Sequence, residues 1–170
     1  ILFGIFSSLG FLSKYLFIYI FLSLFIFFIL NIKKYSRSIK NYLLSIIISL
    51  GLVTPHLIWL LDNNFITIFY GLNRSGFTDY YLINHLKYPL VFLLKQIIVL
   101  IPFFIMIFVI IKKIKIRINT NDKKTLFLIF INFIPILLML MTSVLTGAKI
   151  RTMWMMPFYL FLGTLFLILY

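Results

Sequence analysis

Long apolar runs separated by short clusters of cations are the feature that most constrains the fold of this chain. The sequence is 64% hydrophobic, and its 16 lysines and arginines fall mainly between apolar runs that are too long for the core of a small soluble domain. Its only acids are Asp62, Asp79 and Asp122, whereas a soluble domain has roughly a quarter charged residues. The pattern predicts an all-α, polytopic membrane protein and excludes an ordinary soluble globule.

The apolar runs predict about six membrane-spanning helices. Residues 1–13 and 15–31 would together form a helix of about 46 Å at about 1.5 Å per residue, which exceeds a bilayer core of roughly 30 Å. We therefore expect a tight break near Ser13 and Lys14. The first and last spans are expected to be truncated, because both chain ends lie in apolar runs. The expected spans are residues 1–13, 15–31, 42–60, 89–111, 125–141 and 152–170.

Prolines and small residues predict local features of these helices. Pro55 is expected to break or bend the third span. Pro89 suits the first turn of the fourth span, and Pro102 is expected to kink its middle. Gln96, in the same span, is interpreted as a hydrogen-bonding contact between helices. Because Ala148 is the only alanine, few contacts through small residues are expected, and the exceptions are Gly4, Ser7, Ser8 and Gly10.

The two most cationic links predict which side of the membrane faces the cytoplasm. Residues 32–41 carry four Lys or Arg and residues 112–124 carry six, whereas five lie on the opposite side. Cytoplasmic loops of membrane proteins are enriched in Lys and Arg. We therefore expect one transmembrane domain over residues 1–170, with these two links in the cytoplasm. Residues 61–88 and 142–151 are then external.

Cations on the external side oppose this bias and need another explanation. Lys14 lies between two apolar runs, and Lys149 and Arg151 precede the last span. Arg can bind a phosphate through two parallel hydrogen bonds, whereas Lys acts as a point charge. The three cations predict a site for a lipid-linked phosphate. A lysine that snorkels to the membrane interface explains Lys14 equally well, so both interpretations stay open.

Other polar residues near the expected external surface form a candidate substrate-binding set. Trp59 is interpreted first as an interfacial anchor and His56 first as a hydrogen-bonded residue at a helix end. The segment GFTDYYLINHLKYP is expected to form a helix along the interface. Two histidines and three scattered aspartates show no metal-ligand spacing, so neither a metal nor another cofactor is predicted. The candidate set is Tyr15, His56, Trp59, Asn63, Arg74 and His85.

Four segments in order along the chain resemble one enzyme family. They are GFLSKYLF, PHLIWLLDNNFITIFYGLNRSG, KQIIVLIPFF and GAKIRTMWMMPFY. Together they resemble the bacterial family 39 glycosyltransferases, which are relatives of protein O-mannosyltransferases and aminoarabinose transferases. The resemblance implies a GT-C fold and an enzyme of the bacterial inner membrane. Such an enzyme would transfer a sugar from a polyprenyl-phosphate donor to a lipid A, glycan or protein acceptor on the periplasmic face.

The resemblance also implies roles for particular residues. Lys14 matches the family's lysine that follows a Gly-rich run, and Lys149 and Arg151 fall where relatives have basic residues before an aromatic one. The family's catalytic acid pair lies in a first external loop near the amino terminus, and no segment here matches it. The resemblance therefore implies that the chain is a fragment which lacks the general base and is inactive by itself.

Two other classes of protein fit the same pattern. A lipid or sugar-lipid flippase would share the many spans and the cation-lined path for an anionic lipid. An envelope polysaccharide polymerase or ligase would share the polyprenyl-linked donor. A nucleic-acid partner is excluded, because the cations separate membrane spans instead of covering one soluble face. An acid pair upstream of Ile1 would favour the transferase, and its absence would favour the flippase.

Overall fold

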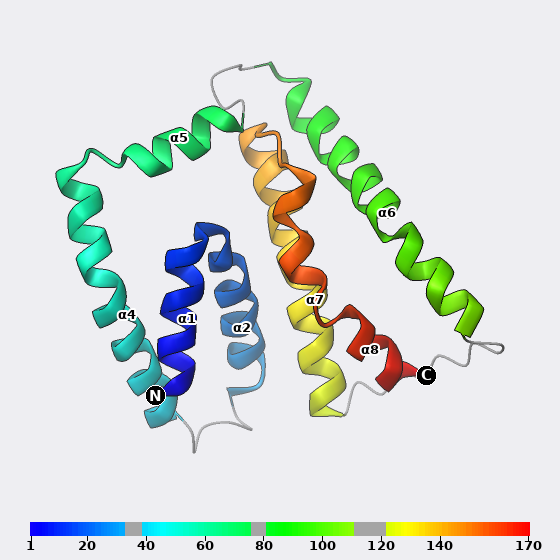
Figure 1. Ribbon diagram of the computed structural model, residues 1–170, viewed down its shortest axis with the longest axis horizontal. Helices are drawn as coiled ribbons and strands as arrows, with labels where there is room; N and C mark the ends of the chain where they lie inside the picture. The colour runs from blue at the N-terminus through cyan, green and yellow to red at the C-terminus, as the bar shows by residue number, and fades with distance from the viewer. Residues whose placement is uncertain (33–38, 76–80, 111–121) are drawn as a thin grey trace. The chain divides into compact units, whose positions relative to one another are not determined.

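The computed structural model describes residues 1–32, 39–75, 81–110 and 122–170, which are mainly helical and contain no strand. The helices form two compact units, Ile1–Asn73 and Arg74–Tyr170. Figure 1 labels them along the chain. In order, they are α1 (Leu2–Ser13), η1 (Tyr15–Phe17), α2 (Ile18–Leu30), α4 (Ile39–Asp62), α5 (Ile66–Arg74), α6 (Asn84–Ile110), α7 (Lys123–Thr146), η3 (Thr152–Trp154), η4 (Met156–Tyr159) and α8 (Leu162–Leu169).

Among the described residues, three helices are long and apolar enough to cross a membrane, which is fewer than the six that we expected. They comprise Ile39–Asp62, Asn84–Val109 and Lys123–Thr146. The second expected span contains the 13-residue α2, which measures about 20 Å at about 1.5 Å per residue. The last expected span is divided into η3, η4 and the eight-residue α8. Apolar length alone did not reveal these interruptions, and Pro157 in η4 supplies a physical reason for one of them.

The three prolines with predicted effects lie inside long helices, namely Pro55 in α4 and Pro89 and Pro102 in α6. Helix α4 continues through Pro55 as far as Asp62, so Pro55 does not break the third span, and the expected bend stays a prediction. Pro89 lies inside α6 and not in its first turn, because this helix already begins at Asn84. Proline removes one backbone donor from a helix, and neighbouring helices in a membrane protein can accommodate that loss.

Much of the expected external loop over residues 61–88 is helical. Helix α5 occupies Ile66–Arg74, and the first turns of α6 begin at Asn84. The segment GFTDYYLINHLKYP is therefore not one separate helix along the interface: its last residues belong to α6, and residues 76–80 lie outside the described residues. In the second expected external loop, 142–151, α7 continues as far as Thr146.

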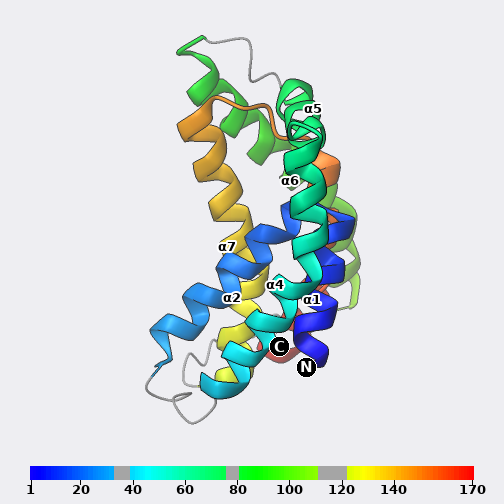
Figure 2. The same ribbon diagram turned by 90° about the vertical axis from the view of Figure 1, so that its left-hand side faces the viewer.

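Helices α1 and α4 of the first unit pack closely through small residues. Of the four small residues for which we expected helix contacts, Gly4, Ser7 and Ser8 are buried and Gly10 is half-buried. A Cβ atom added at Gly4 would lie 2.5 Å from the Ser45 carbonyl oxygen of α4. Figures 1 and 2 both show α1 alongside α4, and Figure 2 shows α2 diverging from this pair. Glycine at position 4 thus permits an approach that any side chain would block.

We expect the Gly4→Ala substitution to separate α1 from α4 and to destabilise the first unit by about 1–3 kcal/mol. The reason is that the new methyl group meets a backbone carbonyl, which cannot move without moving α4. Gly51→Ala is the matched control, because a Cβ atom there has no heavy atom within 4 Å. Thermal unfolding of the purified protein should show a lower unfolding temperature for Gly4→Ala but not for Gly51→Ala. Equal unfolding temperatures for the two variants would contradict the close contact between α1 and α4.

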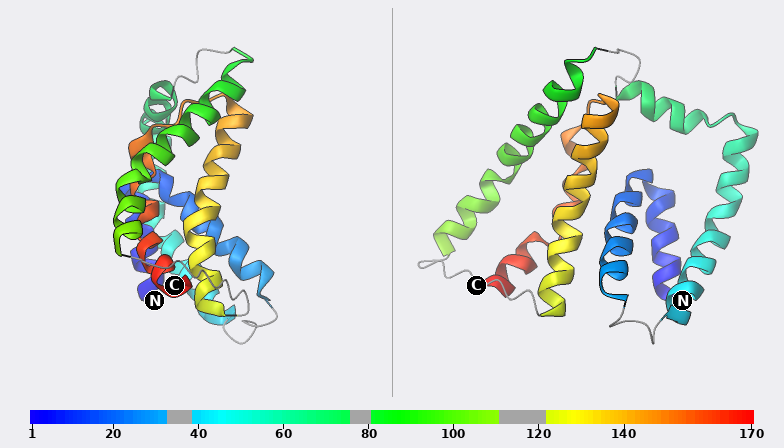
Figure 3. Two further views of the ribbon diagram at one scale, coloured as in Figure 1. Left: turned by 90° about the vertical axis from the view of Figure 1, so that its right-hand side faces the viewer. Right: turned by 180° about the vertical axis from the view of Figure 1, so that it is seen from behind.

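Helices α6 and α7 form an antiparallel pair in the second unit. Their buried faces follow helical spacing, with Pro89, Phe92 and Gln96 on α6. The buried residues of α7 are Thr125, Leu128, Asn132, Pro135, Met139 and Ser143. Figures 1 and 3 show the two helices close together at one end and diverging toward the other, with the C-terminal segment between the diverging ends. This segment contacts α7 through η4 and α8, and α6 through η3.

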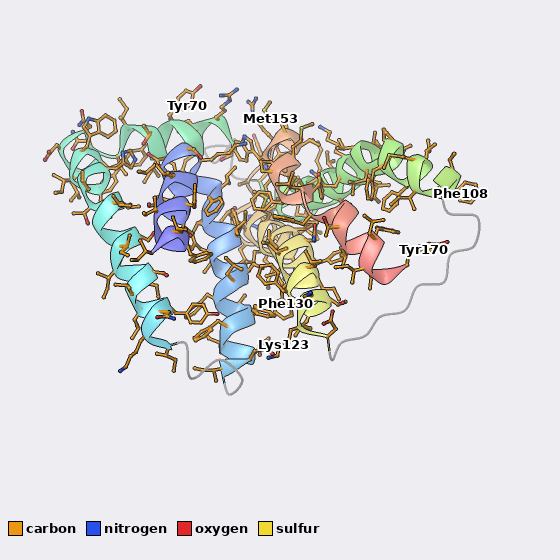
Figure 4. The ribbon with its side chains drawn as sticks, turned by 60° about the horizontal axis from the view of Figure 1, so that its bottom comes forward. Tyr70, Phe108, Lys123, Phe130, Met153 and Tyr170 are labelled. Carbon is orange, nitrogen blue, oxygen red and sulfur yellow. The ribbon has the colours of Figure 1, made fainter. Side chains whose placement is uncertain are left out.

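The outer surfaces of the helices are apolar. In the second unit, Phe108 of α6 is 75% exposed, and Figure 4 shows its side chain at the edge of that helix. Leu145 of α7 is exposed to nearly the same extent. Large exposed apolar surfaces on long apolar helices are typical of contact with lipid. The surface of the described residues therefore fits a membrane protein.

Asp122 caps the amino terminus of α7. Its carboxylate accepts hydrogen bonds from the Thr125 hydroxyl at 2.7 Å and from the Thr125 backbone N–H at 3.0 Å. The hydroxyl bond, followed by the N–H bond, lowers the pKa of the Asp122 carboxyl from its ordinary value. The cap therefore stabilises α7 above the pKa of the unfolded carboxyl, and this stabilisation is lost as the pH falls through the lowered pKa of the folded protein.

We expect Asp122→Ala to fray the first turn of α7, because the Thr125 N–H loses its acceptor. Amide hydrogen exchange at Thr125 measures this fraying directly. Asp122→Asn is the control, since its amide oxygen can still accept the bond but does not titrate. Protection at Thr125 should therefore fall in acid for the native protein and stay constant for the Asn variant. If acid changes the protection of Thr125 equally in the native protein and in the Asn variant, the cap does not form.

Candidate functional site

Lys14 lies at a break in the chain, as the sequence predicted. Helix α1 ends at Ser13, and Lys14 has an extended backbone with φ −158° and ψ 114°. The Lys14 N–H donates to the Gly10 carbonyl at 3.1 Å, and its carbonyl accepts from the Phe17 N–H at 2.9 Å, which begins η1. Backbone hydrogen bonds thus fix the main chain of Lys14 at the end of α1, and its side chain is exposed there.

Tyr15, the next residue, joins three elements of the first unit. Its hydroxyl lies 2.7 Å from His56 Nε2 on α4 and 2.9 Å from Thr67 Oγ1 on α5. A tyrosine hydroxyl can donate one hydrogen bond and also accept, so it can serve both partners at once. The side chains of Tyr15, His56 and Thr67 are each half-buried. We call these three residues and Trp59 the Tyr15 cluster.

Trp59 extends the cluster to the surface. Its ring is stacked on His56, with ring centroids 5.7 Å apart and planes 14° apart. It is 45% exposed, so one part of this aromatic surface stays accessible. The Asn63 side chain donates to the Trp59 carbonyl at 2.8 Å and so covers the end of α4. Asn63, which we predicted as a substrate-binding residue, thus also has a structural role.

The turn between α4 and α5 places Thr67 beside Tyr15. Asn64 and Phe65 both have positive φ, at 51° and 54°, and the Phe65 N–H donates to the Leu60 carbonyl at 2.8 Å. Positive φ is strained for phenylalanine, and such strain is found where a turn is held by the surrounding structure. Figure 1 shows α5 running across the end of α4 after this turn.

His85 has a structural contact in the second unit. Its Nδ1 donates to the Val144 carbonyl at 2.6 Å, in the last turn of α7, where carbonyls lack partners within the helix. Gly147 ends α7 with φ 66°, and a Cβ atom there would lie 3.0 Å from His85 Nε2. The hydrogen bond of His85 therefore joins the start of α6 to the end of α7.

Lys149 and Arg151 lie between α7 and η3. The Lys149 N–H donates to the Ser75 carbonyl at 2.8 Å, and its side chain is exposed. Arg151 is half-buried and caps η3 through an extended backbone. Both cations belong to the second unit, whereas Lys14 belongs to the first. Binding of one phosphate by all three stays a prediction.

The structure brings together Tyr15, His56 and Trp59 from the predicted substrate-binding set. Arg74 is the last residue of α5 and is not a member of this cluster. Thr67 was missed, although it is the first polar residue in the segment ITIFYGLNR and could have been found on that ground. The prediction that Gln96 joins helices is confirmed, because its Oε1 accepts from the Tyr159 hydroxyl at 2.6 Å.

Cation and hydroxyl groups determine what the Tyr15 cluster can bind. It offers hydroxyl and imidazole groups, and Lys14 directly precedes Tyr15 in the chain. Such groups suit phosphate oxygens and sugar hydroxyls. The described residues contain no group of three or more His, Cys, Asp or Glu side chains placed to hold a metal ion. Comparison with known proteins found no matching family model, no matching curated protein and no matching solved structure.

Proposed function

We propose that this protein is a membrane glycosyltransferase that moves a sugar from a polyprenyl-phosphate donor to an envelope acceptor on the periplasmic face. The observation that carries the proposal is the position of Lys14, in an extended break directly before the hydrogen-bonded Tyr15 cluster. A phosphate beside Lys14 would have its sugar within reach of neighbouring hydroxyl and aromatic groups. The three long apolar helices support a membrane location.

The chemistry of sugar transfer gives Lys14 its role. The bond between the sugar C1 and the phosphate oxygen breaks, and the polyprenyl phosphate leaves with the electron pair. The acceptor hydroxyl oxygen forms the new bond to C1, and its proton passes to a general base. Negative charge grows on the phosphate oxygens in the transition state, and a fixed cation stabilises this charge more than it stabilises the ground state.

The other members of the Tyr15 cluster would orient the sugar. Trp59 offers an exposed aromatic surface, on which the apolar face of a sugar ring can lie. Thr67 and Tyr15 share hydrogen bonds that hold their hydroxyls in place. The resemblance to family 39 assigns the general base to an acid pair upstream, which would deprotonate the acceptor. Lys149 and Arg151 are proposed as further contacts of the same donor.

A transfer assay with the full-length protein, which would include the general base that the resemblance assigns to an upstream segment, tests this function. Proteoliposomes would contain the protein, a polyprenyl-phosphate sugar with a radiolabelled sugar, and an extract of envelope lipids and glycans as acceptors. We expect the label to leave the donor and free polyprenyl phosphate to form in equal amount. Movement of the intact donor between leaflets, with no polyprenyl phosphate formed, would contradict a transferase and indicate a flippase.

A further inference from the structure

Two buried amide side chains lie on the packed faces of α6 and α7. Gln96 is 4% exposed and Asn132 is 0% exposed, and each lies among apolar residues of its helix. Both are far from the ends of these helices, which are long enough to cross a membrane. Amides in such positions are expected to form hydrogen bonds, because an unpaired polar group is unfavourable in an apolar interior.

The register of the two helices places these amides at one level. His85 Nδ1 bonds to the Val144 carbonyl, which aligns the start of α6 with the end of α7. From this bond, Gln96 lies eleven residues along α6, and Asn132 lies twelve residues back along α7. At about 1.5 Å per residue these distances are about 17 and about 18 Å. The buried faces of both helices thus have an amide at nearly the same depth.

Each amide has one hydrogen-bonding atom in use and one without a partner. Gln96 Oε1 accepts from Tyr159, and Asn132 Nδ2 donates to the Leu128 carbonyl at 2.8 Å. Gln96 Nε2 and Asn132 Oδ1 have no hydrogen-bond partner among the described residues. The two remaining atoms are complementary, because the first can only donate and the second can only accept.

We propose that one enclosed water molecule bridges Gln96 Nε2 and Asn132 Oδ1. Water can accept from the Gln96 amide and donate to the Asn132 carbonyl oxygen at the same time. Both amides are buried, and enclosed waters in other proteins bond to buried polar groups that lack a protein partner. Together with the bond from Tyr159, the bridge ties α6, α7 and η4 into one hydrogen-bonded network.

A double-mutant cycle tests the bridge in the native protein. The variants are Gln96→Leu, Asn132→Leu and both together, with thermal unfolding as the measurement. We expect each single variant to unfold at a lower temperature than the native protein. The decrease for the double variant should be smaller than the sum of the two single decreases, because either change removes the same water. Phe133→Leu and Ile97→Leu are controls at the neighbouring exposed positions. If Asn132→Leu unfolds at a higher temperature than the native protein, Asn132 Oδ1 has no hydrogen-bond partner in the native protein, and the proposal is overturned.

Hydroxyl-radical labelling of the unaltered protein is a second test that does not depend on the variants folding. Radiolysis of an enclosed water should oxidise Phe92, which lies one turn before Gln96 and is 1% exposed. We expect labelling of Phe92 several-fold above that of Phe27, a buried phenylalanine of α2 with the same intrinsic reactivity and a larger exposed fraction. If Phe92 and the control residue are labelled equally, no water is enclosed there. Non-additive unfolding temperatures in the double-mutant cycle would then indicate a direct bond between the two amides, and the water bridge would be overturned.

Discussion

The Lys14→Ala substitution is expected to reduce sugar transfer roughly 100-fold to 1,000-fold, which is the effect of removing one group that stabilises transition-state charge. Lys14 is exposed at the end of α1, and its side chain is not part of the packing between α1 and α4. The loss should therefore fall on kcat more than on the stability of the protein. Initial rates of polyprenyl-phosphate formation in proteoliposomes measure the effect.

Two matched variants separate a phosphate contact from an interfacial anchor. Lys40→Ala removes an exposed cation from the first turns of α4 and should leave transfer unchanged. Lys14→Arg should retain part of the activity, because arginine keeps the charge with a different hydrogen-bonding geometry. If Lys14 only snorkels to the interface, Lys14→Ala would transfer sugar at the native rate, and the proposed role would be wrong.

The second large effect is expected for Gly147→Val, at the end of α7. The backbone there has φ 66°, which is unfavourable for any side chain and most of all for a β-branched one. A Cβ atom would also lie 3.0 Å from His85 Nε2. We expect a loss of about 2–5 kcal/mol from the two causes together. Equilibrium unfolding of the purified protein in mixed micelles measures the loss.

Further variants at this turn distinguish the two causes. Gly147→Asn keeps a residue that tolerates positive φ but still places a Cβ atom beside His85. Combining Gly147→Ala with His85→Ala removes the steric contact and leaves the backbone strain, and His85→Ala alone measures the loss of the bond to the Val144 carbonyl. We expect Gly147→Asn and the combined variant to be more stable than Gly147→Val. A valine variant as stable as the native protein would mean that α7 does not end in the left-handed conformation.

Local sequence features predicted several elements correctly. The break at Lys14 followed from the length of the first apolar runs relative to a bilayer, and the structure ends α1 at Ser13. The small residues at positions 4, 7 and 8 predicted a close helix contact, and they are buried. Gln96 was identified as a contact between helices because an amide in an apolar span needs a partner. The described residues contain fewer helices long enough to cross a membrane than we expected, since apolar length does not show where a helix is interrupted.

The sequence by itself determined that this protein is helical and apolar and that its chain breaks at Lys14, because backbone hydrogen bonds and hydropathy act over short stretches of chain. Only the tertiary structure decided which side chains meet. Tyr15 bonds to His56 and Thr67, which are 41 and 52 residues away, and Tyr159 bonds to Gln96 over 63 residues. Such partners depend on the packing of whole helices, since the hydrogen-bonding capacity of a side chain does not specify which distant group will satisfy it.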